Sequence, residues 1–381
     1  MKKIILMIVV SISSSHLYSK ESNTDTKALM QDAFFSLTQL LPVITYEMDY
    51  KNPNNHKLIN SHLNRMVESF KKGNHQTFLQ NPTLKPNLNS LQENLKSSLL
   101  NFNNSNKAFS RLRLIDATNL CVSCHTQLSN DRVFSPLLNS ETLIKKVTNN
   151  KYQLGNLYFI LKDYDSAITA YTSFLKSKLK TKDEYFNKYV FESFFKSVYI
   201  TAKVYSSPEK TIDFLNSLKK QIKLPKYILS EHEIFYKRAQ YWQSQFDLDN
   251  KELSKPKILQ ILTRFEKKIN SKSSILSGEF DYDLMILSGI LSKSLISKKL
   301  NNDTIVLYWM GIAEYRLGKS IFLNIGDLYL KECIRKDPKS KLAKTCFEAL
   351  EDETKFRFTG TSGINIPDSI SKELKELKNL L

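Results

Sequence analysis

The stretch YQLGNLYFILKDYDSAITAYTSFL, from Tyr152 to Leu175, decides the fold of this chain. Its apolar residues recur at intervals of three and four, which predicts two helices on either side of the polar KDYD segment. Gly155 and Ala167 are small enough to let these helices approach closely, and large residues such as Tyr171 fill the groove between them. The stretch therefore predicts a helical hairpin.

The spacing within this hairpin resembles that of a tetratricopeptide repeat, as carried by Leu154, Gly155, Tyr158, Ala167 and Tyr171. A weaker unit with the same spacing ends the series, and it contains Leu307, Gly311, Gly326, Leu330, Cys333 and Pro338, with about six residues inserted. The helical stretches between the two are interpreted as degenerate repeats. The resemblance implies a helical solenoid over residues 140–355, with a loop and a capping helix at 356–381; a non-repeating helical domain is the alternative.

The rest of the chain also predicts helices. It holds nine Gly and ten Pro, and its apolar residues recur with the helical period rather than with the alternation typical of strands. We therefore predict an all-α fold, with an N-terminal four-helix bundle followed by the solenoid.

Four amphipathic stretches define the predicted bundle at residues 25–132. The first is expected to end near Pro42, and the second before Gly73. Each has one apolar face, so the simplest way to bury all four faces is to pack them together. The faces are Met30/Phe34/Leu37/Leu41, Ile59/Leu63/Met66/Phe70, Leu88/Leu91/Leu95/Leu99/Phe102 and Phe109/Leu112/Ile115/Leu120.

The N-terminus indicates export. Lys2 and Lys3 precede an apolar run, which is followed by small and polar residues, as in a secretory signal peptide covering residues 1–19. An uncleaved anchor is the alternative, but the apolar run is short for one. No later stretch is suited to span a bilayer, so we expect a periplasmic or otherwise exported protein without a transmembrane segment after cleavage.

Charge and motifs limit the function classes. The formal net charge is +18, yet no block of five basic residues occurs, and no basic run is interleaved with aromatic residues as in a nucleic-acid groove. We therefore expect no nucleic-acid partner, while weak association with acidic partners or membranes stays open. No phosphate-binding loop, serine nucleophile motif or paired-carboxylate pattern stands out, so we expect no enzyme.

The motif Cys121-Val122-Ser123-Cys124-His125 carries the chemistry. Two thiols about one helical turn apart, with an adjacent imidazole, suit the covalent attachment of haem c. A zinc site needs two further ligands at a matching spacing, which the chain lacks, and a thioredoxin-like dithiol needs a βαβ context. Chance occurrence is the remaining alternative. The motif therefore predicts one covalently bound haem c.

The motif and its place at the end of the fourth predicted helix resemble the class II c-type cytochromes of the cytochrome c-prime and c-556 kind. The resemblance covers roughly residues 25–130. It implies that Cys121 and Cys124 form the thioether bonds and that His125 is the proximal iron ligand. In that family a glycine is common three residues before the first cysteine, whereas this chain has Thr118.

The same resemblance implies that the first helix supplies the distal side of the haem. Met30 is the first candidate ligand, against the alternative that it belongs to the apolar core. His62 is the next candidate, against an ordinary solvated or hydrogen-bonded histidine. Arg111 and Arg113 could pair with haem propionates, or be ordinary surface residues.

The other cysteines and histidines have simpler interpretations. Cys333 and Cys346 flank a turn at Pro338, so an oxidising compartment would permit a disulfide; two buried thiols are the alternative. The remaining histidines have no ligand-spaced partner and are expected at the surface: His56, His75 and His232.

These features predict a periplasmic monohaem c-type cytochrome that transfers electrons. Its helical repeats would dock a redox partner protein or hold the haem domain in an envelope assembly. Two other functions stay open. One is a haem-based gas or redox sensor, and the other is an envelope scaffold in which the haem has a structural role.

Overall fold

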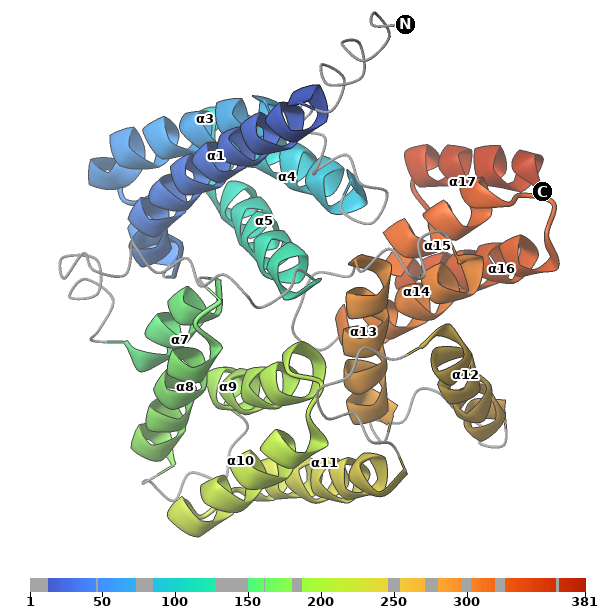
Figure 1. The fold of residues 1–381 in the computed structure, drawn as a ribbon. Coiled ribbons are helices and arrows are strands. Elements are labelled where there is room, and N and C mark those ends of the chain that lie inside the picture. The colour runs from blue at the N-terminus through green and yellow to red at the C-terminus, as the bar shows by residue number, and fades with distance from the viewer. Residues whose placement is uncertain are drawn as a thin grey trace, which may run out of the picture. The chain divides into compact units, whose positions relative to one another are not determined.

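The computed structural model describes residues 13–45, 47–72, 85–127, 150–160, 162–179, 187–245, 254–270, 280–296, 303–318, 326–360 and 363–381. These residues are almost entirely helical, which confirms the all-α prediction (Figure 1). The chain divides into two compact units, Met1–Cys124 and His125–Leu381. Among the described residues, no helix combines the length and the apolar character needed to cross a membrane.

The first unit contains α1 (Ser13–Thr45), α2 (Glu47–Lys51), the 3-10 turn η1 (Pro53–Asn55), α3 (His56–Lys72), α4 (Lys85–Asn103) and α5 (Lys107–Gln127). Helix α3 packs along both α1 and α4 (Figure 1). The predicted stripe of α3 is confirmed, since Ile59, Leu63, Met66 and Phe70 are all buried.

The first helix differs from the prediction at its end and on its face. It continues past Pro42 to Thr45. Pro42 has no backbone N–H to donate to the Thr38 carbonyl, four residues earlier, yet the helix continues. The buried face of α1 is centred on other residues than expected: Leu29, Ala33, Ser36, Leu37, Leu40, Leu41 and Ile44 are buried, whereas Met30 and Phe34 are half-buried.

The predicted face of α5 is wrong. Phe109 and Leu112 are exposed, and of the predicted stripe only Leu120 is buried. The face that points inward carries Ser110, Leu114, Ala117 and Leu120. Sequence periodicity missed it because a small serine and a small alanine occupy two of its positions.

The second unit contains α7 (Lys151–Ile160), α8 (Tyr164–Lys178), α9 (Lys188–Tyr199), the π-helical turn η4 (Ile200–Val204), α10 (Pro208–Gln221), α11 (Lys226–Gln245), α12 (Lys255–Asn270), α13 (Asp281–Ile296), α14 (Thr304–Gly318), α15 (Gly326–Lys336), α16 (Lys341–Arg357) and α17 (Asp368–Leu380). Two short strands, β1 (Thr359–Gly360) and β2 (Gly363–Ile364), pair between α16 and α17. Consecutive helices pack in pairs, notably α7 with α8, α10 with α11, and α14 with α15.

Glycines set the closest helix contacts in this unit. A Cβ added at Gly155 of α7 would lie 2.5 Å from the ring of Tyr171 on α8. Likewise, a Cβ added at Gly326 of α15 would lie 2.5 Å from the carbonyl oxygen of Gly311 on α14. At this helix spacing a Cβ at either position would force a neighbouring group to shift, and the sequence pattern predicted this close approach for the hairpin of α7 and α8.

A buried polar cluster joins helices that are distant in sequence. Lys203 of η4 forms an ion pair with Glu314 of α14, and the Ser288 hydroxyl of α13 donates to the same carboxylate at 2.5 Å. Nearby, Gly289 packs against the backbone of η4, since an added Cβ would lie 2.2 Å from the Lys203 carbonyl oxygen. A π-helical turn widens the helix locally, and here it brings Lys203 to α13 and α14.

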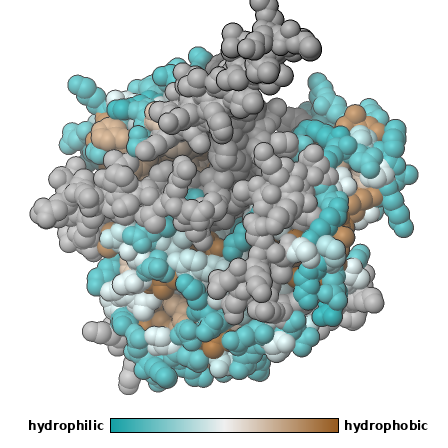
Figure 2. Space-filling view, viewed as in Figure 1, coloured by the Kyte–Doolittle hydropathy of each residue, from teal (hydrophilic) through white to brown (hydrophobic). Residues whose placement is uncertain are grey.

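On the face drawn in Figure 2, the coloured residues are largely teal, with apolar residues scattered among them. Exposed apolar side chains of the first unit include Leu100, Phe109 and Leu112.

Candidate functional site

The Cys-His motif lies in the last turns of α5. The backbone is helical from Lys107 to Gln127, so Cys121, Cys124 and His125 occupy successive positions of one helix. With about 100° of rotation per residue, the Cα atoms of the three lie within an arc of about 100°. The structure thus brings the three predicted residues to one side of α5; the side chains of Cys124 and His125 lie outside the described set.

That side is the inward side of the helix. Cys121 follows Ser110, Leu114 and Ala117 at intervals of three and four, and it is half-buried. Residues at this spacing share one helix face. The corrected face of α5 therefore includes Cys121, and the helical backbone places Cys124 and His125 at neighbouring angular positions.

A hydroxyl network positions the start of α5. The Ser98 hydroxyl donates to the Ser110 carbonyl at 2.9 Å, and the Ser110 hydroxyl donates to the Ser98 carbonyl at 2.8 Å. The buried Tyr50 hydroxyl lies 2.8 Å from the Ser110 hydroxyl, and burial raises the pKa of Tyr50. Arg111 Nε donates to the Ile44 carbonyl at 2.6 Å. Contacts from α1, α2 and α4 thus set the position of α5 and hence of the motif.

Met30 lies on α1 away from two residues that contact α3. Asp32 pairs with Arg65, and Phe35 lies against His62. Met30 is about 160° around the helix from Asp32 and about 140° from Phe35, close to the angular positions of Leu37 and Leu41. It is half-buried, so the structure places it at the edge of the core rather than within it.

His62 lies at the seam between α1 and α3. Its ring centroid is 5.8 Å from that of Phe35, whose side chain is 43% exposed. Its Nδ1 atom is buried without a hydrogen-bond partner among the described residues. Burial, and then the Arg65 charge, lower the pKa of His62. The imidazole is therefore neutral at neutral pH, and it lies at the contact between α1 and α3.

Met66 is a candidate that sequence reasoning left in the core. It is 1% exposed, on the inward face of α3. Near the start of α3, His56 contacts Phe102, and near the start of α5, Ser110 contacts Tyr50, which itself packs on Phe102. These contacts bring the start of α3 and the start of α5 together. Met66 is about 15 Å along α3 from its start, and Cys121 is at a similar distance along α5, so the two residues lie at similar depths. In the sequence, Met66 is a methionine on a clear apolar stripe, and this pattern is equally typical of a core residue and of a haem ligand.

The two arginines before the motif have protein partners. Arg111 is bonded to α1 as described, and Arg113 Nη1 lies 3.5 Å from the Asp116 carboxylate. Burial raises the pKa of Asp116, against the opposing effect of Arg113. Thr118, where the related family has glycine, donates its hydroxyl to the Leu114 carbonyl at 2.9 Å and fits the helix.

The structure also describes the cysteine pair and some of the remaining histidines. A disulfide links Cys333 of α15 to Cys346 of α16, with their Cα atoms 6.4 Å apart. The expectation of a surface position is wrong for His232, which is 3% exposed on α11. His56 is half-buried, beside Phe102, and His75 lies outside the described residues.

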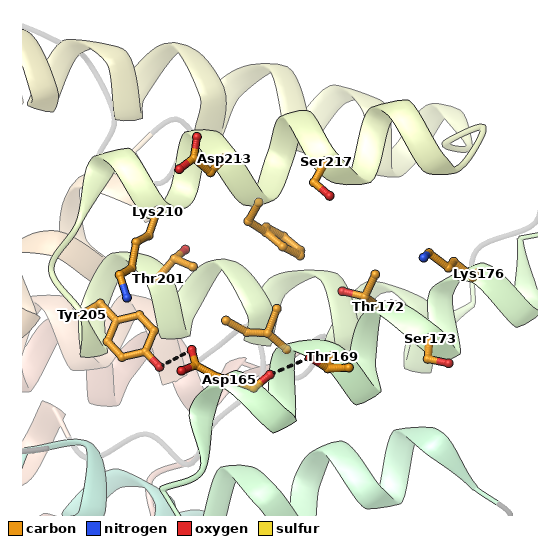
Figure 3. A pocket seen from close by; sticks show the side chains of 12 residues that line it. Asp165, Thr169, Thr172, Ser173, Lys176, Thr201, Tyr205, Lys210, Asp213 and Ser217 are labelled. Carbon is orange, nitrogen blue, oxygen red and sulfur yellow. Dashed lines mark hydrogen bonds between the residues drawn. The ribbon is translucent and has the colours of Figure 1, made fainter.

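A groove of about 580 Å³ lies between α8 and α10 (Figure 3). Tyr205, the residue after η4, lies at one end of the groove. Its hydroxyl donates to the Asp165 carboxylate at 2.8 Å, and Lys210 Nζ lies 4.2 Å from the centre of its ring. Lys176 stands at the other end (Figure 3). Two carboxylates and two ammonium groups line the groove, together with hydroxyl groups and the apolar Ile168 and Phe214: Asp165, Asp213, Lys176 and Lys210 carry the charges.

Among the described side chains, no group of three or more His, Cys, Asp and Glu residues is arranged to hold a metal ion. A half-buried thiol, a second cysteine one turn later and an adjacent histidine, all on one side of one helix, are residue types that could hold a covalently attached haem. No family model, no curated protein and no solved structure matches the chain.

Proposed function

We propose that the chain is an exported monohaem c-type cytochrome that transfers electrons, in which the second unit docks a redox partner. The observation that carries the proposal is the position of Cys121, Cys124 and His125 within one turn and a third of α5, in line with its buried stripe. A bound haem c would supply one-electron chemistry at its iron. The class II cytochrome resemblance and a four-helix arrangement of α1, α3, α4 and α5 belong to the same proposal.

The chain's own residues have distinct tasks in this proposal. Cys121 and Cys124 would hold the haem through thioether bonds, and His125 would bind its iron. The hydroxyl network of Tyr50, Ser98 and Ser110 positions the helix that carries them. Met30 is the proposed distal ligand, because it is a half-buried methionine of α1, about 140° around the helix from Phe35, which contacts α3.

The second unit supports the proposal in two ways. The disulfide between Cys333 and Cys346 is typical of proteins in oxidising compartments, which favours export to the periplasm. Paired helices with glycine contacts, as in α7 with α8, favour tetratricopeptide-like repeats. The groove between α8 and α10 offers one place where a partner could bind.

Expression with the haem-attachment machinery tests the proposal. We expect a coloured protein whose haem stays with the polypeptide after acid-acetone extraction, and a colourless Cys121→Ala/Cys124→Ala variant. Colourless wild-type protein would contradict the cytochrome assignment.

The spectrum of the ferrous form tests the distal ligand. We expect a six-coordinate low-spin spectrum that becomes high-spin in Met30→Leu and stays low-spin in Met48→Leu, since Met48 is 79% exposed. If the spectrum becomes high-spin in Met66→Leu instead, the distal ligand is Met66 of α3. A high-spin wild-type protein that binds CO rapidly would favour the gas-sensor function over electron transfer.

A further inference from the structure

A second site lies in the second unit, independent of the Cys-His motif. Residues of α10 and α11 line a cavity of about 250 Å³ that is open to solvent: Asn216, Lys219, His232, Glu233, Tyr236 and Lys237. Lys219 comes from α10 and Lys237 from α11. Neither ammonium group forms an ion pair with a carboxylate of the described residues, so the cavity has a positive charge that Glu233 offsets only in part.

His232 adds a defined hydrogen-bond requirement. Its side chain is buried, with its ring plane parallel to that of Tyr236 and the ring centroids 6.3 Å apart. Its Nε2 lies 2.9 Å from the Leu215 carbonyl oxygen, which can only accept, so Nε2 carries the hydrogen. In the neutral ring Nδ1 is then an acceptor, and it is buried with no partner among the described residues. A buried polar atom without a partner is rare and calls for one.

We propose that this cavity binds a phosphate group, either free or as a small phosphomonoester. Lys219 and Lys237 balance its negative charge, and Nδ1 of His232 accepts the hydrogen of its hydroxyl group. Inorganic phosphate suits both requirements because each of its anionic forms near neutral pH keeps at least one hydroxyl, whereas a monoester, whose second pKa is about 6, keeps one only in its minor monoanionic form. Sulfate and carboxylates have the charge but no such hydrogen at neutral pH. The lysine side chains are exposed and can move to admit the anion to the ring.

Calorimetric titration of the purified full chain at pH 7 tests the site, with inorganic phosphate and sulfate as probes. We expect saturable phosphate binding, at least about tenfold tighter than sulfate, because one charge-assisted hydrogen bond separates the two anions. Equal affinities in the wild type, or no saturable phosphate binding, would overturn the proposal. Glycerol phosphate distinguishes the sources: tighter binding than inorganic phosphate assigns the site to a monoester, and equal or weaker binding assigns it to free phosphate.

Three variants separate the roles. His232→Gln keeps an amide donor for the Leu215 carbonyl but removes the Nδ1 acceptor, so it should lose the preference for phosphate over sulfate. Lys219→Ala should weaken both anions by a similar factor. Lys220→Ala is the matched control, since Lys220 is an exposed neighbour on α10 that does not line the cavity. An equal loss in the two lysine variants would mean general charge attraction and would overturn the site. Thermal unfolding of each variant checks that it is folded.

Discussion

Lys203 is buried with its charge, in an ion pair with Glu314 that ties η4 to α14. Burial alone would lower the pKa of Lys203, but the Glu314 carboxylate and Tyr199 outweigh it and raise the pKa. Removing one partner leaves the other charge buried and uncompensated. We therefore expect Lys203→Met to lower the free energy of unfolding by about 3–5 kcal/mol, measured by urea denaturation.

The double variant Lys203→Met/Glu314→Gln is the control for this prediction. It removes both charges and leaves an amide oxygen for the Ser288 hydroxyl, so it should be more stable than Lys203→Met alone. A double variant as unstable as the single one would show that packing, rather than the unpaired charge, accounts for the loss.

The lowered pKa of His62 predicts that the free energy of unfolding falls on mild acidification. Its pKa in the folded chain is below the ordinary 6.5, mainly because of burial. Between the two pKa values the unfolded chain binds more protons, so stability falls as pH drops below about 6.5. One such histidine contributes at most about 1.4 kcal/mol per pH unit, and less here because the ring is only partly buried. Urea denaturation at pH 7.5 and 5.5 should show a smaller loss in His62→Gln than in the wild type. An identical loss in both would contradict the assignment.

At the scale of elements, the α7–α8 hairpin depends on Gly155. Alanine has the higher helix propensity, by about 1 kcal/mol, but its Cβ would meet the buried Tyr171 ring. We expect the clash to win, so that Gly155→Ala lowers the unfolding free energy by about 1–3 kcal/mol. Gly360→Ala is the matched control, since an added Cβ there meets nothing within 4 Å. A stabilised Gly155→Ala variant would mean that the helices can move apart.

The disulfide is the second test at this scale. It closes a loop with a sequence separation of 13 between α15 and α16. A cross-link of this loop length stabilises the fold by about 3 kcal/mol, through the lower entropy of the unfolded chain. Cys333→Ala/Cys346→Ala should therefore unfold at a lower urea concentration than the wild type. Equal midpoints, with the bond verified by mass spectrometry, would contradict this estimate.

The success of sequence reasoning about elements depended on which residues fill the buried face. The stripe of α3 could be predicted because Ile59, Leu63, Met66 and Phe70 are all large and apolar. That of α5 could not, because Ser110 and Ala117 are small and Ser110 is buried through reciprocal bonds with Ser98. His232 was missed for a related reason: its burial comes from a bond to a carbonyl on another helix. Such contacts leave no periodic signal.

At the scale of the whole molecule, the all-α class followed from the scarcity of glycine, proline and alternating patterns. The place of the Cys-His motif on a helix also followed from sequence, but the alignment of Cys121 with the buried stripe required the corrected face of α5. The ion pair between Lys203 and Glu314 could not be predicted, because 111 residues separate its partners. Contacts of that range depend on how helices pair, which the local pattern does not determine.

The net charge of +18 makes a prediction for the whole chain. Like charges repel in the compact state, and raising the ionic strength from about 0.01 M to 0.15 M shortens the screening length from about 30 Å to about 8 Å. Surface ion pairs such as Lys51 with Glu47 are weakened too, but exposed pairs contribute little. We therefore expect sodium chloride to raise the urea midpoint over this range. Lys220→Glu, which lowers the net charge by two at an exposed position, should reduce that rise. A midpoint that falls with salt would mean that attractive pairs outweigh the excess of positive charge.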